Sequence, residues 1–234
     1  MFKSLTLATL AVIVLIGVVA AFALRPTAPA SESMRTTPFS GLPALSEDPE
    51  AAAEVAGTNA KVLTIAPGAA EARFVVDEVL RGSANTVVGS TDQVSGQIMV
   101  SPTQPADTYL SPVMINARTL ATDDTQRNNA IRRFILGTDE HEYITFTPTD
   151  VIGLPENATL GQPYSLRVPG QLTIRGVTQE VVFDATVTPI SAEELRGTAA
   201  TTIRYGEWDI RIPQVPFVAG VSDEVRLELD FTAV

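Results

Sequence analysis

Apolar and polar side chains alternate along most of the chain after residue 70. In residues 168–187, which read VPGQLTIRGVTQEVVFDATV, apolar side chains occupy every second position on both sides of a short polar stretch. A period of two is typical of β-strands with one buried face. The same pattern predicts eight strands, whose inner faces carry Phe74 and Val76; Val94, Gly96, Ile98 and Val100; Val113, Ile115 and Ala117; Ile144 and Phe146; Tyr164, Leu166, Val168, Gly170, Leu172 and Ile174; Val181, Phe183, Ala185 and Val187; Leu195, Gly197, Ala199, Thr201 and Ile203; and Val225, Leu227, Leu229 and Phe231.

Each predicted strand has only one apolar face, which favours an antiparallel sheet that closes on itself or packs against another sheet. Closure into a barrel also removes exposed edges. One helical segment is predicted at residues 124–136, where Ile131, Phe134 and Ile135 recur at helical spacing, and either Asp123 or Asp124 supplies the N-cap. The sequence therefore predicts an all-β fold, an eight-stranded antiparallel barrel with one short helical insertion.

The ribbon at residues 168–187 is predicted to be a hairpin. Pairing Ile174 with Val181 brings the two apolar faces together and sets Arg175 opposite Glu180 on the outer face. An opposite-charge pair across two strands contributes about 0.2–1 kcal/mol. This register leaves residues 176–179 as the turn.

Residues 5–24, LTLATLAVIVLIGVVAAFAL, are uncharged and almost entirely apolar. A helix of this length matches the hydrocarbon core of a bilayer, which is about 30 Å thick. A cleaved secretion signal is the alternative, because residues 21–23 resemble a cleavage site. The length favours an anchor. Both interpretations predict an exported protein, either membrane-anchored and facing outside the cytoplasm, or periplasmic or secreted.

Three regions are therefore expected. Residues 1–24 form a signal peptide or transmembrane anchor, residues 25–70 a flexible Pro/Ala/Ser-rich linker, and residues 71–234 the barrel. The linker has no sustained apolar period, and a flexible coil of its length spans roughly 35–40 Å. That reach would let a tethered barrel touch a membrane surface.

The charge balance argues against nucleic acid as a partner. The chain has 16 Lys and Arg residues against 27 Asp and Glu residues, and its formal net charge is −11 at pH 7. Phosphate backbones are therefore repelled on average. The chain has no cysteine, which excludes disulfides, thiolate metal sites and thiol nucleophiles.

Residues that carry catalytic chemistry are scarce. His141 is the only histidine and lies among acidic residues in the run TDEHE at residues 138–142. An enzyme that uses His141 with Glu140 or Glu142 is one hypothesis, but a single histidine among scattered carboxylates is more often a solvated turn. No nucleophile elbow, phosphate-binding glycine loop or HExxH pattern occurs. The sequence predicts no enzyme activity, no metal and no cofactor other than a bound lipid.

An eight-stranded barrel is about the smallest that can hold one small ligand among its own side chains. Small residues stand at several predicted inward positions, namely Gly96, Ala117, Gly170, Ala185, Gly197 and Ala199. Two interpretations stay open. Either these residues leave a tunnel, or they let the walls approach closely around Phe74, Phe146, Phe183 and Phe231.

The lining of such a tunnel predicts its ligand. Almost every inward side chain is an uncharged hydrocarbon, so the expected guest is a long apolar chain, stabilised by about 0.8 kcal/mol per buried methylene. The candidate ligand-binding residues are Phe74, Val76, Val94, Gly96, Ile98, Val113, Ile115, Ala117, Ile131, Phe134, Ile144, Phe146, Leu166, Val168, Gly170, Leu172, Ile174, Val181, Phe183, Ala185, Gly197, Ala199, Leu227 and Leu229.

Residues 170–178, GQLTIRGVT, resemble the G-x-LTIRGVT signature of the YceI-like family. Residues 95–98 (SGQI), 116–122 (NARTLAT), 127–132 (RNNAIR), 143–146 (YITF) and 222–227 (SDEVRL) resemble further family segments in the same order. The resemblance covers about residues 72–234. It implies an exported protein with a lipocalin-like barrel that binds polyisoprenoids or related lipids inside the barrel, and so it favours an open bore.

Two positions depart from the family pattern. Asn128 stands where the family usually has Asp, and Tyr143 is followed directly by Ile144 without the usual intervening proline. These departures concern the conformation of the helix and the start of a strand. The barrel itself does not depend on them.

The residues and the resemblance together predict an exported protein that holds a polyisoprenoid or another long-chain apolar lipid for sequestration or transport. Residues 124–136 are the candidate lid over one mouth. The expected partners are this lipid and, if residues 5–24 are not cleaved, the membrane; a homodimer is compatible with the sequence. The alternative is a solid barrel that acts as an interaction module in the cell envelope.

Overall fold

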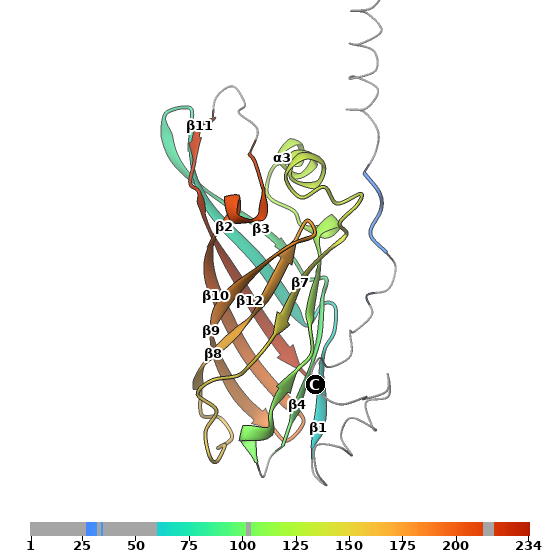
Figure 1. Ribbon diagram of the computed structural model, residues 1–234, viewed down its shortest axis with the longest axis vertical. Helices are drawn as coiled ribbons and strands as arrows, with labels where there is room; N and C mark the ends of the chain where they lie inside the picture. Colours follow the sequence, from blue (N-terminus) through green and yellow to red (C-terminus); the bar gives the residue numbers. More distant parts are fainter. Residues whose placement is uncertain (1–26, 32–33, 35–59, 102–103, 213–217) are drawn as a thin grey trace, which may run out of the picture.

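The structure is a computed structural model that describes residues 27–31, 34, 60–101, 104–212 and 218–234 (Figure 1). The apolar segment at residues 5–24 and most of the expected linker lie outside these residues. Among the residues that the structure describes, no helix is both long enough and apolar enough to cross a membrane.

A single sheet of 12 antiparallel strands curls into a barrel (Figure 1). Its strand order is β1-β4-β6-β7-β8-β9-β10-β12-β2-β11, with β3 paired to β2 and β5 paired to β4. The strands are β1 (Lys61–Ile65), β2 (Ala70–Leu80), β3 (Ser83–Thr91), β4 (Val94–Val100), β5 (Tyr109–Leu110), β6 (Val113–Asn116), β7 (Tyr143–Pro148), β8 (Tyr164–Ile174), β9 (Val177–Ser191), β10 (Glu194–Arg204), β11 (Val218–Val221) and β12 (Glu224–Ala233).

Two sets of backbone hydrogen bonds close the curled sheet. The N–H of Thr64 in β1 donates to the carbonyl of Val234 at 2.7 Å, and the N–H of Val234 donates to the carbonyl of Thr64 at 3.1 Å. Farther along the seam, Ser90 in β3 and Ala121 exchange hydrogen bonds of 2.9 and 3.0 Å. Because β1 also pairs with β4, and β3 with β2, these bonds join the two edges of the sheet.

A helical insertion lies between β6 and β7. It consists of α3 (Thr125–Ala130) and one turn of π-helix, η3 (Ile131–Ile135). Asp124 is the N-cap, and its side chain accepts a hydrogen bond from the N–H of Arg127 at 2.8 Å. The predicted helix at residues 124–136 is thereby confirmed. The shorter helices are η1 (Pro105–Asp107), η2 (Ala117–Thr119) and η4 (Tyr205–Trp208).

The all-β, antiparallel prediction is confirmed, but the predicted number of strands was too low. The eight predicted strands correspond to β2, β4, β6, β7, β8, β9, β10 and β12. The strands that were not predicted are β1, β3, β5 and β11. One of them, β1, lies within residues 25–70, the segment expected as linker.

The missed strands other than β1 are short or lack a clear apolar period. The inner face of β3 carries Asn85 and Gly89 beside Val87. The amide of Asn85 donates to Glu78 at 2.9 Å, and Gly89 lies against the ring of Phe74. These inward positions are filled by a polar contact and by a neighbouring ring, so the sequence of β3 alone does not alternate.

The β8–β9 hairpin was predicted, but its predicted register was wrong. Ile174 pairs with Val177 rather than with the residue four positions later, and the turn consists of Arg175 and Gly176 alone. Their φ angles are 52° and 76°. Two positive φ angles fit the type I′ turn, whose twist suits paired strands. The inner faces were still predicted correctly, because the register differs by an even number of residues.

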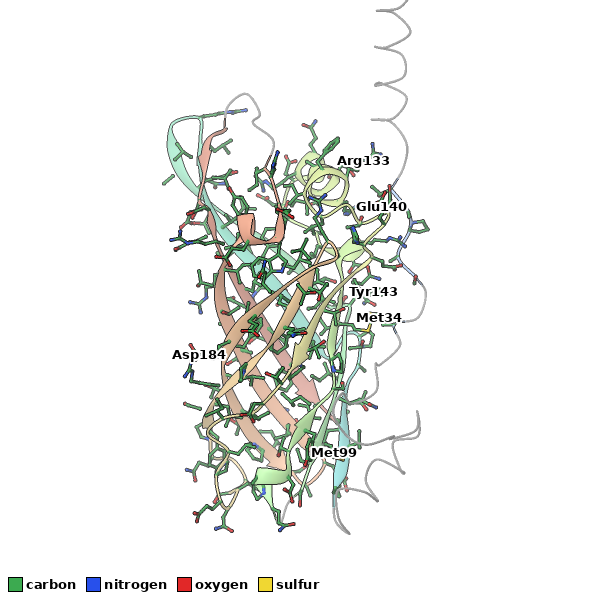
Figure 2. All side chains as sticks on the ribbon, in the orientation of Figure 1. Met34, Met99, Arg133, Glu140, Tyr143 and Asp184 are labelled. Atoms are coloured by element: carbon green, nitrogen blue, oxygen red, sulfur yellow. The ribbon has the colours of Figure 1, made fainter. Side chains whose placement is uncertain are left out.

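The outer face of the barrel is polar. Asp184 on β9 points away from the barrel (Figure 2). On β2 and β12, the guanidinium of Arg73 contacts Glu71 at 2.8 Å, Glu228 at 3.2 Å and also Asp230. Charged residues thus alternate with inward apolar residues along the same strands, and the barrel buries only its inner face.

Candidate ligand-binding site

The barrel encloses a cavity of about 1040 Å³. Pockets for small molecules typically measure roughly 300–1,000 Å³, so this cavity is large. Its lining extends from Leu80, near α3, to Ala192, in the β9–β10 turn at the other end. Of the two interpretations that the sequence left open, the structure supports a hollow barrel.

Most residues predicted to bind the ligand line this cavity. They come from every predicted strand and from the helical segment: Phe74, Val76, Ile98, Val113, Ile115, Ile131, Phe134, Ile144, Phe146, Leu166, Val168, Ile174, Phe183, Ala185, Ala199, Leu227 and Leu229. Sequence reasoning missed Leu63 and Ile65, which lie in the segment expected as linker. Their alternate spacing in KVLTI was the available signal.

Other predicted residues are not part of the cavity lining. Leu172 is 2% exposed and lies in the core beside Trp208, whose indole N–H donates to the carbonyl of Leu172 at 3.0 Å. Gly96 is buried close to Val113 and Ile65. The full set is Val94, Gly96, Ala117, Gly170, Leu172, Val181 and Gly197.

The inward glycines support aromatic rings. A Cβ atom on Gly197 would lie 2.4 Å from Cζ of Phe231. Carbon atoms in contact lie about 3.5–4.0 Å apart, so the ring occupies the place of a side chain at this position. The same arrangement joins Gly170 to Phe146 and Gly89 to Phe74. Each ring thus lies over a glycine of the neighbouring strand, against the barrel wall, rather than filling the bore.

The inward alanines have a different role. Ala185 and Ala199 face each other across β9 and β10, and both line the cavity. Next to them, Phe183 and Phe146 meet edge to face, with ring centroids 4.8 Å apart. The bore therefore stays open where two short side chains meet, beside a fixed aromatic pair.

The segment from α3 to η3 lies at one end of the barrel (Figure 1). Ile131 is buried, whereas Phe134 lines the cavity and is still 58% exposed. The guanidinium of Arg127 lies 3.5 Å from the carboxylate of Glu78 on β2, and Arg175 donates to the carbonyl of Ile135 at 3.0 Å. These contacts position the segment at the mouth of the bore.

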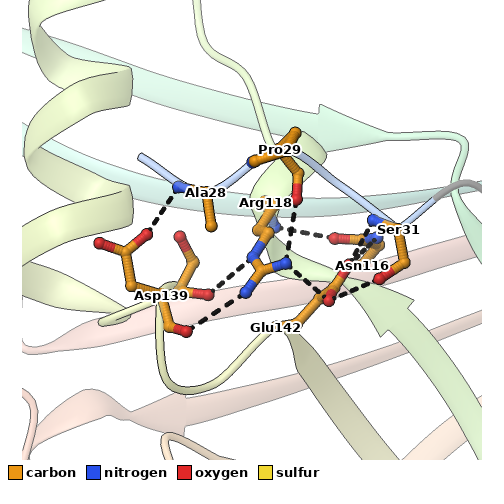
Figure 3. Close-up of polar contacts among 8 residues, drawn as sticks. Ala28, Pro29, Ser31, Asn116, Arg118, Asp139 and Glu142 are labelled. Carbon is orange, nitrogen blue, oxygen red and sulfur yellow. Dashed lines mark hydrogen bonds and ion pairs between the residues drawn. The ribbon is translucent and has the colours of Figure 1, made fainter. Parts of the chain in front are cut away.

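The acidic run around His141 does not assemble a metal site. Within the described ranges, no group of three or more His, Cys, Asp or Glu side chains is placed to hold a metal ion. Glu142 instead forms an ion pair with Arg118 at 2.7 Å, and both side chains are largely buried. Asn116 donates to the same carboxylate at 3.0 Å. We call Asn116, Arg118, Asp139 and Glu142 the Arg118–Glu142 platform (Figure 3).

Residues 28–31, which we call the N-terminal strap, are hydrogen-bonded to this platform (Figure 3). The N–H of Ala28 donates to Asp139 at 2.8 Å, and Arg118 donates to the carbonyl of Pro29 at 2.9 Å. The N–H and hydroxyl of Ser31 donate to Glu142 at 2.7 and 2.9 Å. Both backbone and side-chain groups therefore hold the strap on the barrel.

Glu142 accepts two hydrogen bonds from the strap. Burial raises the pKa of this carboxyl, but hydrogen bonds from Ser31 and Asn116 and the charge of Arg118 outweigh burial, so the pKa lies below its ordinary value. Glu142 is therefore ionised at neutral pH. It accepts hydrogen bonds from the strap as a carboxylate.

The sequence pattern of the YceI-like domain family matches residues 63–233, which is most of the chain. The chain belongs to the YceI-like family. The match begins within β1, so the family domain includes this strand. No curated protein sequence matches the chain.

Solved structures share the YceI-like fold. A polyisoprenoid binding domain from Saccharophagus degradans, implicated in plant cell wall breakdown, is 14% identical, covers 73% of this chain and 97% of its own, and has a TM-score of 0.57. BcnA from Burkholderia cenocepacia is 17% identical, with coverages of 73% and 99% and a TM-score of 0.57. The YCEI protein of Campylobacter jejuni is 19% identical, with coverages of 62% and 82% and a TM-score of 0.50.

The position that departs from the YceI-like pattern in the helix keeps an acceptor role. Asn128 is buried, and its amide oxygen accepts hydrogen bonds from the N–H and the hydroxyl of Thr122 at 2.7 and 2.8 Å. Its amide N–H donates to the carbonyl of Thr122 at 3.3 Å. The amide thus holds α3 against the preceding loop, and this departure does not disturb the helix.

Proposed function

We propose that this YceI-like protein is an exported, non-enzymatic carrier that holds a polyisoprenoid or another long-chain apolar lipid in its bore. The observation that carries this proposal is the cavity of about 1040 Å³, lined along its length by side chains such as Ile98, Leu166 and Leu227. The polyisoprenoid binding domain of Saccharophagus degradans, which shares the fold, supports the same class of ligand.

The chemistry of the lining suits a chain of hydrocarbon rather than a sugar or a nucleotide. Each methylene that enters contributes about 0.8 kcal/mol, so ten or more exceed the cost of immobilising the chain. The charged lining residues include Glu78, Arg81 and Arg127 at the α3 end. A lipid with a polar end would therefore place that end at this mouth and its hydrocarbon deeper in the bore.

Export and anchoring are part of the proposal and rest on residues 5–24. Their apolar run is followed by Arg25, and the barrel comes after it in the chain. N-terminal sequencing of the protein from its producing cell would separate the two forms. A mature protein that starts near residue 24 would indicate a cleaved, released form. A protein that still starts at residue 1 would indicate a membrane-anchored form.

The experiment that tests the function is native mass spectrometry of the full chain purified from its own membranes, followed by organic extraction. We expect a discrete apolar lipid at about one copy per chain, released on unfolding. A folded protein that carries no lipid, and that takes up none from vesicles of membrane extract, would contradict the proposal.

A further inference from the structure

The N-terminal strap and the start of the barrel lie at opposite ends of the molecule. The strap binds Asp139, just after η3, at the α3 end (Figure 1). β1 begins at Lys61, whose ammonium group forms an ion pair at 3.0 Å with Glu193 in the β9–β10 turn. The 15 residues of β9 separate this turn from the β8–β9 turn, next to η3.

This placement has a consequence for a chain that is anchored through residues 5–24. Leu24 precedes Ala28 by only four residues, and an extended chain spans at most about 3.6 Å per residue. An anchor that ends at Leu24 would therefore hold the strap, and with it the α3 end, within about 14 Å of the membrane boundary. Without the strap, the tether would run from Leu24 to Lys61 and would join the barrel at the other end.

The α3 end also exposes apolar side chains. Phe134 is 58% exposed on η3, and Val79, next to the β2–β3 turn, is 40% exposed. Arg133 follows Arg132 immediately before Phe134. An exposed aromatic ring beside long cationic side chains suits the interface between lipid headgroups and acyl chains.

We propose that the α3 end of the barrel rests on the membrane that residues 5–24 enter, that the N-terminal strap holds it there, and that lipid passes between bilayer and bore through this mouth. The inference rests on the proposed function in its anchored form. It adds the direction of exchange, because the segment at this mouth, with Ile131 and Phe134, would be the first part of the barrel that the lipid meets.

The strap acts through effective concentration. Its release would lengthen the tether from four residues, Leu24 to Ala28, to 37 residues, Leu24 to Lys61. Effective concentration falls roughly as the −3/2 power of tether length, so we expect lipid transfer from the surrounding bilayer to slow about tenfold or more. The barrel would also be free to turn its other end toward the membrane.

The test uses the full chain in phosphatidylcholine vesicles and exploits the absence of cysteine. Phe134→Cys and Leu160→Cys each introduce one thiol at positions of similar exposure, 58% and 63%. Leu160 lies at the other end, since the N–H of neighbouring Gly161 donates to Pro189 of β9 at 2.7 Å. A fluorophore on residue 134 should be quenched by lipids that carry a quencher on their acyl chains, and one on residue 160 should not.

A second set of variants breaks the strap and leaves the barrel unchanged. Ala28→Pro with Ser31→Pro removes two N–H donors to the platform. Ala30→Pro is the matched control, because it places a proline between them and keeps both donors. We expect the double variant to lose quenching at residue 134 and to slow lipid transfer from the vesicles about tenfold, and the control to do neither.

Three quenching results would overturn the inference. They are equal quenching at residues 134 and 160, stronger quenching at residue 160, and full quenching at residue 134 in the double proline variant. Failure of the chain to associate with vesicles would also overturn it. In each case, lipid retained by the purified protein would show that the proposed binding function survives, so the two failures are distinguishable.

Discussion

Gly197 and Ala199 lie two residues apart on the same face of β10, yet they shape the bore in different ways. Gly197 pairs with Phe231, and the ring of Phe231 lies over it. Ala199 pairs with Leu229 and lines the cavity itself. A small inward residue can therefore either receive a ring from the next strand or leave room for a ligand, and the cross-strand partner decides which.

The largest expected effect comes from filling the part of the bore beside Ala185 and Ala199. Ala199→Phe would place a ring in the bore and displace several methylenes of the ligand, so we expect affinity for a long-chain lipid to fall about 100-fold. Titration of the delipidated protein with a fluorescent lipid would measure this change.

The matched control for this variant is Ala200→Phe, one residue along β10, whose partners Glu228 and Asp184 lie on the outer face. It should bind lipid normally. Equal affinity of the two variants would contradict binding inside the bore.

The second effect concerns the free energy of unfolding and the contact between Gly197 and Phe231. Gly197→Ala brings a methyl group to 2.4 Å from the ring of Phe231, and we expect overpacking to lower the free energy of unfolding by about 1–3 kcal/mol. Denaturant titration would measure it. Gly220→Ala on β11 is the control, because nothing lies within 4 Å of its Cβ position.

A double variant sharpens this comparison. Phe231→Leu in the Gly197→Ala background should restore part of the lost stability, because the smaller side chain can move away from the new methyl group. If the two single substitutions change the free energy of unfolding additively, the position of the Phe231 ring does not depend on the glycine at residue 197.

A smaller effect is expected from removing polar contacts of α3, a change that leaves Gly197, Ala199 and their neighbours intact. Arg127→Gln removes the ion pairs with Glu78 at 3.5 Å and Asp123 at 2.6 Å, which together contribute about 1 kcal/mol, or fivefold in a rate. Lipid release should accelerate by up to this factor in stopped-flow transfer to acceptor vesicles. Arg167→Gln removes the exposed pair with Asp184 on the outer wall and should leave release unchanged.

The smallest expected effect is a pH dependence of the strap. The pKa of Glu142 lies below its ordinary value of 4.5, so its contribution is fully present above about pH 4.5 and is lost as the pH falls through the lower pKa. Fluorescence anisotropy of a label on Thr27→Cys should therefore be high at neutral pH and fall in acid. Constant anisotropy across this range, in a barrel that stays folded, would contradict the role of Glu142.

The sequence predicted the faces of the strands better than their number or register. Leu166, Phe183 and Leu227 alternate with polar residues, so their inward direction follows from the period of two. The inner face of β3 could not be found this way. Its Asn85 and Gly89 are not apolar side chains, and their inward places depend on contacts with Glu78 and Phe74 of β2. The register of the β8–β9 hairpin depends on positive φ at Arg175, a conformation that the apolar pattern does not encode.

The apolar chemistry of the candidate site was predicted, but which inward residues line the cavity was not. Gly197 and Ala199 are alike in sequence pattern, and only the position of the Phe231 ring separates them. The strap could not be predicted either, because its hydrogen bonds join Ala28 and Ser31 to residues 111 positions later. Contacts of this kind depend on the folded barrel rather than on any local pattern.

The most direct test of the central claim, that hydrocarbon lies inside the barrel, is a photocrosslinking map. A polyisoprenoid analogue with a photoreactive group near its tail would be bound, irradiated and located by mass spectrometry of peptides. We expect adducts on inward residues of several strands, such as Ile98, Ala199 and Leu227. Adducts confined to outward residues such as Ala200 and Asp184, in a protein that binds the analogue, would contradict it.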